Sequence, residues 1–210
     1  DINNFIKVRE SNIKFSKNLC LLNIRGGEYK RFKNLILPKI YWDNAVKNMK
    51  SINKNLTFKI ITDDYKYADK LFPEYEILKG NTAHDFIQIH NAEYLIVSNS
   101  SFSYFPISLG NKPKFIIAPA LWSRFGNKFN RWCSPANYYD GWHYQDNEGR
   151  LLSEMLIKEY LCQTKYFYSS FNVLTTKNSL ERKSILDYIP FNIKRKIKII
   201  LANIFPLNFG

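Results

Sequence analysis

The stretch YLIVSNSSFS, residues 94–103, joins a short apolar run directly to a cluster of small polar side chains. Such a run predicts a buried strand, and Ser and Asn are favoured at the start of the helix that would follow. The first backbone N–H groups of a helix lack partners within it and carry the positive end of its dipole, so they attract anions. We therefore interpret the cluster as a set of ligand contacts, with helix capping as the alternative. Its candidate residues are Ser98, Asn99, Ser100, Ser101 and Ser103.

A second junction of this kind is LCLLNIRGGEY, residues 19–29, in which an apolar strand delivers Arg25 into a turn at Gly26 and Gly27. An arginine binds a diphosphate through forked, charge-assisted hydrogen bonds, and glycines allow a positive φ and a close approach of the backbone to a ligand. A structural ion pair for Arg25 and a plain turn for the glycines are the alternatives. Together the two junctions suggest a ligand that carries phosphate.

Short apolar runs alternate with helical patterns over the first two-thirds of the chain, which is typical of parallel strands joined by crossover helices. We expect strands at 19–24, 57–61, 76–78, 94–97 and 115–117, and helices at 38–52, 65–72, 82–91, 102–109 and 151–162. The predicted fold is therefore α/β, with a doubly wound and mostly parallel sheet. Ligands of such sheets bind beyond the carboxyl ends of the strands, near the point where the strand order reverses.

Carboxylates also follow one of the predicted strands, at Asp63 and Asp64. Adjacent carboxylates can ligate Mg²⁺ beside phosphates, but we expect a contact to ribose or base, or capping of the helix that begins at Tyr65. Asp85 either caps the helix at 82–91 or reaches the nucleotide. We expect no metal site, because the three histidines of the chain share no metal-ligand spacing.

The composition is that of a globular protein with an anionic partner. The 210 residues are 45% hydrophobic and carry a formal net charge of +13, which suits nucleotide phosphates, a membrane surface or nucleic acid. The cysteines, Cys20, Cys133 and Cys162, have no metal-type pairing and favour a reducing compartment. Neither a secretory signal nor an apolar run of about 18–20 residues is evident, so we expect a cytoplasmic protein.

Four segments together resemble one known family. DFIQIHNAEYLIVSNSSFSY, residues 85–104, resembles the serine motif of the bacterial alpha-1,2-fucosyltransferases, glycosyltransferase family eleven. NIRGGEY at 23–29 is similar to the family's first motif, His-x-Arg-Arg-Gly-Asp-Tyr, ITDD at 61–64 to its Ser-Asp-Asp strand end, and IAPALW at 117–122 to its Ala-Pro-x-x-Trp segment. The chain departs from the family pattern at Asn23, Gly26, Glu28 and the pair Tyr104-Phe105.

The resemblance implies the Rossmann-like donor domain of a GT-B glycosyltransferase, which transfers fucose from GDP-fucose to a glycan hydroxyl with inversion and needs no cofactor. Arg25 would stabilise the charge on the leaving diphosphate. Glu28 would be the general base, and an ion pair with Lys30 or Arg31 is its alternative. The implied donor contacts are Asn23, Arg25, Gly26, Gly27, Asp63, Asp64 and the serine cluster. The resemblance also implies an N-terminal acceptor domain, which we expect to lie outside these 210 residues.

We expect two regions, a nucleotide-sugar binding domain at 1–165 and a basic segment at 166–210. Isoleucines recur at helical spacing between residues 193 and 204 beside lysines and an arginine. This pattern is typical of an amphipathic helix on an anionic membrane, and packing on the donor domain is the alternative. Membrane contact would place the enzyme on the inner face of the cytoplasmic membrane, near a lipid-linked glycan acceptor.

Two other functions stay open, a nucleotide-binding fragment without catalysis and a basic nucleic-acid-binding protein. A nucleic-acid binder should carry a continuous basic stripe interleaved with exposed aromatic residues. Here the densest basic run is confined to the tail, so we expect no nucleic-acid partner. The aromatic region at 118–149, with Trp122, Trp132 and Trp142, either packs a loop-rich lobe or stacks on a nucleobase or sugar.

Overall fold

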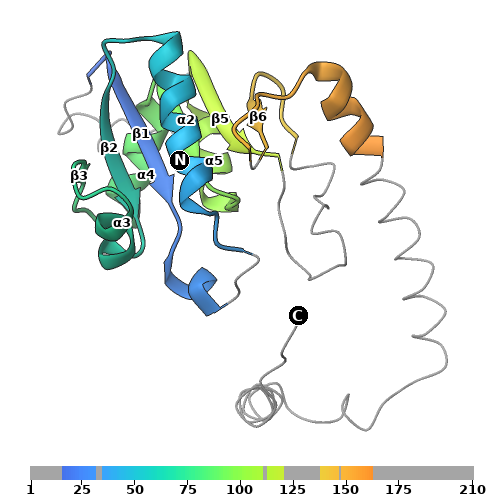
Figure 1. Cartoon of the computed structure of the whole chain (residues 1–210). Coiled ribbons are helices and arrows are strands. Elements are labelled where there is room, and N and C mark those ends of the chain that lie inside the picture. The colour runs from blue at the N-terminus through green and yellow to red at the C-terminus, as the bar shows by residue number, and fades with distance from the viewer. Residues whose placement is uncertain (1–15, 32–34, 111–112, 121–137, 147, 163–210) are drawn as a thin grey trace, which may run out of the picture. The chain divides into compact units, whose positions relative to one another are not determined.

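A computed structural model describes residues 16–31, 35–110, 113–120, 138–146 and 148–162 (Figure 1). The basic segment predicted at 166–210 lies outside these residues, as do Trp122, Trp132 and Cys133. Within the described ranges, no helix is long and apolar enough to span a bilayer.

In the described part of the chain, six strands form one sheet in which every neighbouring pair is parallel. Its order is β3-β2-β1-β4-β5-β6. The strands are β1 (Leu19–Ile24), β2 (Thr57–Thr62), β3 (Glu76–Ile77), β4 (Tyr94–Val97), β5 (Phe115–Pro119) and β6 (His143–Gln145). The order reverses between β1 and β4, so the carboxyl ends of these two strands flank the crevice where doubly wound sheets bind ligands. The predicted fold class is confirmed.

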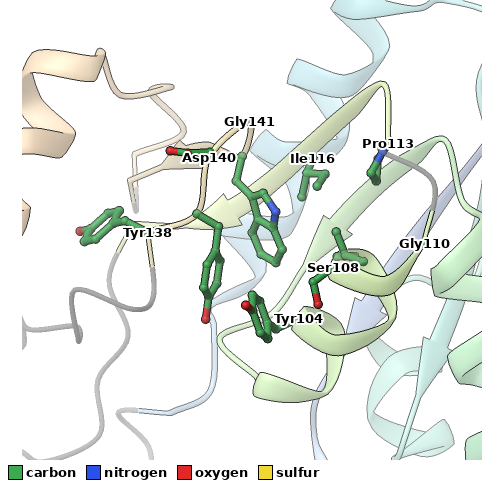
Figure 2. A pocket seen from close by; sticks show the side chains of 11 residues that line it. Tyr104, Ser108, Gly110, Pro113, Ile116, Tyr138, Asp140 and Gly141 are labelled. Atoms are coloured by element: carbon green, nitrogen blue, oxygen red, sulfur yellow. The ribbon is translucent and has the colours of Figure 1, made fainter. Parts of the chain in front are cut away.

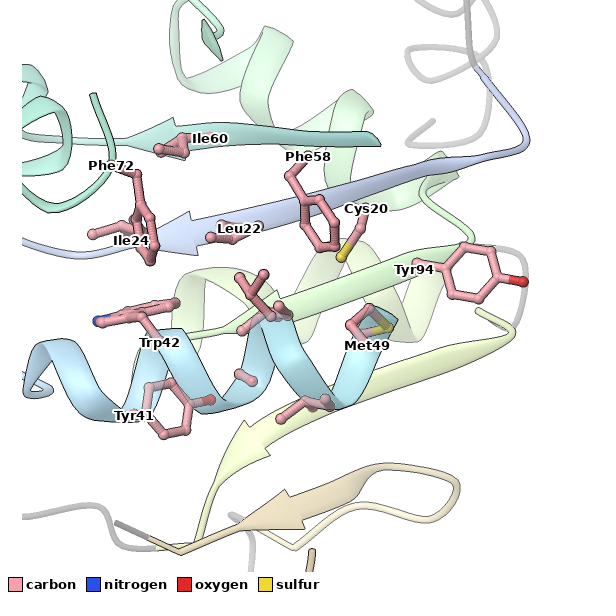
Figure 3. Close-up of a cluster of buried hydrophobic side chains, with 14 of the residues drawn as sticks. Cys20, Leu22, Ile24, Tyr41, Trp42, Met49, Phe58, Ile60, Phe72 and Tyr94 are labelled. Carbon is pink, nitrogen blue, oxygen red and sulfur yellow. The ribbon is translucent and has the colours of Figure 1, made fainter. Parts of the chain in front are cut away.

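Helices cover both faces of this sheet. They are η1 (Gly27–Arg31, a 3-10 helix), α2 (Lys39–Ile52), α3 (Tyr65–Leu71), α4 (Thr82–Asn91), α5 (Ser101–Leu109) and a last helix at 154–162. Alternate residues of a strand point to opposite faces, and β1 follows this rule. Cys20 and Leu22 pack with α2 and α3 (Figure 3), whereas Leu21 packs with α4 and α5.

The observed elements match the predicted ones closely, and the largest shift is at the last helix, which begins at residue 154 rather than 151. The structure adds η1 and β6, which the apolar pattern does not predict. β6 contains a fully buried glutamine, Gln145, whose side chain donates to the Tyr41 carbonyl at 2.9 Å and accepts from Asn48 Nδ2 at 2.8 Å. A strand held to α2 by a buried amide carries little of the hydrophobic signal on which strand prediction depends.

The buried hydroxyl of Tyr41 yields a prediction about stability. It donates to the carbonyl of Val97, the last residue of β4, at 2.9 Å. Tyr41→Phe leaves that buried carbonyl without a partner, so we expect the free energy of unfolding to fall by about 1–2 kcal/mol. Urea denaturation measures the change, and Tyr65→Phe is the matched control because Tyr65 is exposed. Equal stability of the two variants would contradict the assigned role of this hydrogen bond.

Candidate functional site

Arg25 directly follows the carboxyl end of β1. Its side chain is held there by Asp63, which follows β2. Its Nη1 lies 3.2 Å from Asp63 Oδ2, and its guanidinium lies over the Tyr29 ring, 5.6 Å from the centroid. The structural ion pair considered for Arg25 is therefore present. The side chain is still 24% exposed and lines a cavity, so an anion can reach it.

The glycine turn after Arg25 packs directly against the two carboxylates. Gly27 has a φ of +20°, and a Cβ there would overlap the Asp63 carboxylate. A Cβ on Gly26 would lie 2.8 Å from Asp64 Cβ and from the Tyr67 ring. The chain can approach Asp63 and Asp64 this closely only because both positions are glycine.

Asp64 has a structural role. Its side chain caps α3 by accepting from the Tyr67 N–H at 3.1 Å, and its other oxygen pairs with Lys30. The hydrogen bond from Lys30 lowers the pKa of Asp64 from its ordinary value, in opposition to the effect of burial. The predicted capping of the helix at Tyr65 is thus confirmed for Asp64. Within the described ranges, no three His, Cys, Asp or Glu side chains are grouped to hold a metal.

The serine cluster lies at the carboxyl end of β4, as expected, and part of it caps α5. Ser100 Oγ accepts from the Phe102 N–H at 3.3 Å, and Ser103 Oγ donates to the Ser100 carbonyl at 3.0 Å from a fully buried position. The capping alternative is confirmed for Ser100. Asn99 ties the loop to the segment before α2, because its Nδ2 donates to the Leu35 carbonyl at 3.0 Å. Ser101 is exposed.

Several buried polar atoms at the ends of β1 and β4 have no hydrogen-bond partner among the described residues. They are Asn23 Oδ1, Arg25 Nε, Ser98 Oγ and Asn99 Oδ1. The Ser98 N–H donates to the Asn23 carbonyl at 3.2 Å, so the two strand ends are direct neighbours. Buried polar groups nearly always have partners. A group of unpartnered ones at the point where strand order reverses indicates that a polar ligand or water completes the site.

A cavity of about 340 Å³ opens beside these strand ends. It brings together three of the predicted donor contacts, Asn23, Arg25 and Asp63, and adds Asp85 and Phe102. The serine cluster, also predicted to contact the donor, does not line this cavity, so the structure does not bring the serines and Arg25 together in it. The link between the two groups is Tyr29, whose hydroxyl donates to the Asn99 carbonyl at 3.3 Å.

Asp85 is a cavity residue and not a helix cap. The cap of α4 is Asn81, whose side chain accepts from the His84 N–H at 2.9 Å, so the capping interpretation of Asp85 is wrong. Burial raises the pKa of Asp85, whose Oδ1 lies 3.6 Å from His84 Nδ1 and whose side chain is 16% exposed. The sequence contains a signal for this, because Asn81 directly precedes the predicted helix and asparagine is a favoured cap.

Glu28, the predicted general base, is exposed in η1 and has no ion pair in the part of the chain that is described. Its alternative partner Lys30 pairs with Asp64. The carboxylate of Glu28 is therefore available at the same sheet edge as Arg25, and the structure leaves its role as a prediction.

A larger cavity, of about 520 Å³, lies between α5 and the segment at 138–142 (Figure 2). Its lining includes four aromatic side chains, three of which pack on each other. The ring centroids of Tyr104 and Tyr139 lie 4.4 Å apart, and those of Tyr139 and Trp142 lie 4.9 Å apart. None of the described residues that line it is a predicted donor contact or has a buried polar atom without a partner. Its chemistry fits the packing interpretation of the aromatic region, so we place the functional site at the smaller cavity.

Comparisons with known proteins show which proteins the chain resembles. Over 121 residues the chain is 31% identical to an alpha-1,2-colitosyltransferase of Escherichia coli, a match that covers 50% of this chain and 41% of that protein. The predicted resemblance is confirmed. Over 125 residues it is 24% identical to the O-antigen biosynthesis glycosyltransferase WbnK of Escherichia coli, covering 53% of this chain and 41% of the relative. No family model and no solved structure matches the chain.

The two contacts of Asp64 can be separated by substitution. Asp64→Ala removes both the cap and the Lys30 pair, and we expect it to lower the free energy of unfolding by about 1–2 kcal/mol. Asp64→Asn keeps a good cap and loses only the pair, so it should cost less than about 1 kcal/mol. Urea denaturation compares both with Asp69→Asn, an exposed carboxylate on the same helix.

The pH dependence of the same variants follows from the lowered pKa. A carboxylate with a lower pKa in the folded state stabilises the protein above its unfolded pKa, near pH 4, and loses that contribution as the pH falls through the folded pKa. The stability difference between wild type and Asp64→Asn should therefore shrink below about pH 4. A difference that is unchanged down to pH 2 would contradict the ionic part of the interaction.

Proposed function

We propose that this chain carries the donor-binding part of a glycosyltransferase, which uses GDP-fucose and transfers the sugar with inversion to a hydroxyl of a glycan acceptor. The observation that carries the proposal is Arg25, a partly exposed guanidinium that precedes a glycine turn where the strand order reverses. At the ends of the same two strands, several buried polar atoms have no partner among the described residues. The similarity to two glycosyltransferases supports the same class of reaction.

Arg25 supplies the charge that such a reaction needs. The leaving group is a nucleoside diphosphate, and negative charge grows on it as the bond to the sugar breaks. A guanidinium has five N–H donors in a fixed fork, so Arg25 can keep Asp63 and still offer donors to a phosphate. Fixed donors in a partly dehydrated site stabilise such charge more strongly than water does.

Asp85 supports a guanine base over the other bases. A carboxylate accepts hydrogen bonds and donates none when ionised, and the Watson–Crick edge of guanine presents two adjacent donors, N1–H and the N2 amino group. Cytosine and adenine each present only one amino group, and uracil presents one N–H. Asn23 Oδ1 adds a further unpartnered acceptor to the cavity that Asp85 lines. The base and the diphosphate would then bind to different residues of one cavity, Asp85 and Arg25.

The acceptor side of the reaction is also part of the proposal. Glu28 is the candidate general base. The matched region spans 41% of each relative, and the proposal includes a further, acceptor-binding region that completes the enzyme. The name of one relative specifies a colitosyl group, which makes colitose the alternative sugar. Membrane attachment through residues 166–210, next to a lipid-linked glycan, also remains a prediction.

The first test is nucleotide binding by the 210-residue chain. We expect GDP to raise the melting temperature, and Arg25→Ala to weaken GDP binding at least about tenfold because a charge-assisted hydrogen bond is lost. Isothermal titration with GDP, UDP, CDP and ADP measures both, and Arg31→Ala is the control for the change in net charge. A wild type that binds no nucleotide, or equal affinities in the two variants, would overturn the proposed site.

The second test is base selectivity. Asp85→Asn replaces one acceptor by a donor, so we expect the preference for GDP over UDP to fall about tenfold or more. Because burial already disfavours the charge of Asp85, the variant should unfold at the same or a higher temperature, which separates loss of recognition from loss of fold. Asp69→Asn is the matched control. An unchanged GDP preference would exclude Asp85 from base recognition.

A further inference from the structure

We propose that Asp63 is a positioning residue of the nucleotide site, whose carboxylate fixes both the Arg25 guanidinium and the glycine turn in the arrangement that receives the diphosphate. The inference rests on the proposed function and deepens it. It also replaces the direct donor contact predicted for Asp63.

Both oxygens of this one carboxylate are engaged, each with a different part of the anion site. Oδ1 accepts from the Gly26 N–H at 2.9 Å, and Oδ2 lies 3.2 Å from Arg25 Nη1. The first contact holds backbone and the second holds a side chain. Balancing the charge of Arg25 requires only the contact to its guanidinium. The second contact, to the Gly26 N–H, also fixes the backbone of the residue that follows Arg25.

The position of Asp63 is itself fixed on two sides. β1 and β2 pair in register as far as Ile24 and Thr62, so Arg25 and Asp63 follow paired residues. On the other side Asp64 caps α3 and pairs with Lys30. The overlap that a Cβ on Gly27 would make with the Asp63 carboxylate shows how closely the turn is seated on it.

Electrostatics distinguishes positioning from direct contact. A carboxylate repels a phosphate, so Asp63 is a poor partner for the diphosphate itself. Its negative charge also weakens the attraction of Arg25 for an anion. This loss of binding energy is offset only if Asp63 holds the Arg25 side chain in one conformation. An arginine held in its bound conformation loses less side-chain entropy when the ligand arrives. Asp63 therefore favours diphosphate binding because it restricts the conformations of the Arg25 side chain.

The experiment is a double-mutant cycle on the 210-residue chain, measured by isothermal titration with the tightest-binding nucleoside diphosphate, expected to be GDP. Asp63→Asn keeps an acceptor for Gly26 and loses the ion pair, so GDP affinity should fall about tenfold. In an Arg25→Ala background the same change should have no further effect, because the residue acts through Arg25. Asp63→Glu, which restores the charge, should recover part of the loss, and Asp69→Asn should change nothing.

Guanosine is the second probe, titrated at millimolar concentration by ligand-observed NMR. It lacks phosphate, so Asp63→Asn should leave its binding unchanged if Asp63 acts through Arg25. A parallel loss of guanosine and GDP binding would show a direct contact to ribose or base and overturn the inference. So would a tenfold loss that persists without Arg25, or GDP affinity equal to or above that of wild type. A wild type that binds no nucleoside diphosphate would instead refute the proposed function.

Discussion

The parallel pairing of β1 between β2 and β4 determines which polar groups meet at the edge of the sheet. Ile24 pairs with Thr62 and Asn23 pairs with Val97. The residues that follow each pair are therefore neighbours, which brings Arg25 to Asp63 and Ser98 to the carboxyl end of β1. A shift of one residue in either register would send these side chains to the wrong face. Because β1 is buried on both faces, that shift is opposed by close packing: Cys20 and Leu22 fit one core and Leu21 fits the other. The packing of the core therefore sets the geometry of the site.

Polar groups buried at this edge of the sheet lower the stability of the fold, and the core must offset that loss. Polar atoms of Asn23, Ser98 and Asn99 are buried without partners in the described part of the chain, and each such group is destabilising relative to a hydrogen-bonded one. Such unfavourable polar groups persist because the surrounding structure holds them in place. A bound ligand or water can supply the missing hydrogen bonds. The capped start of α5 is part of that structure, because Ser100 holds the loop that carries Ser98 and Asn99.

Much of the fold could be predicted from the sequence, because strands buried on both faces appear as unbroken apolar runs. The exception, β6, is held by the buried amide of Gln145. For the site, the sequence pattern indicated the strand ends that line the cavity. It could not show which role each of two adjacent, similar residues has. Asp63 and Asp64 look equivalent in sequence, and only three-dimensional neighbours show that one caps a helix while the other holds an arginine. Serines that could bind a ligand and serines that cap a helix are likewise indistinguishable by type.

The outer strands of the sheet are both short. β3 spans Glu76–Ile77 and β6 spans His143–Gln145. Lys59 and Glu76 form an ion pair beside the first, and an antiparallel bridge from Leu151 to Gln145 covers part of the second. A long, bare outer strand would offer its backbone to the strands of other molecules, and charged or covered margins discourage such pairing. The margins of this sheet therefore protect the protein from aggregating edge to edge while its central strands serve the ligand.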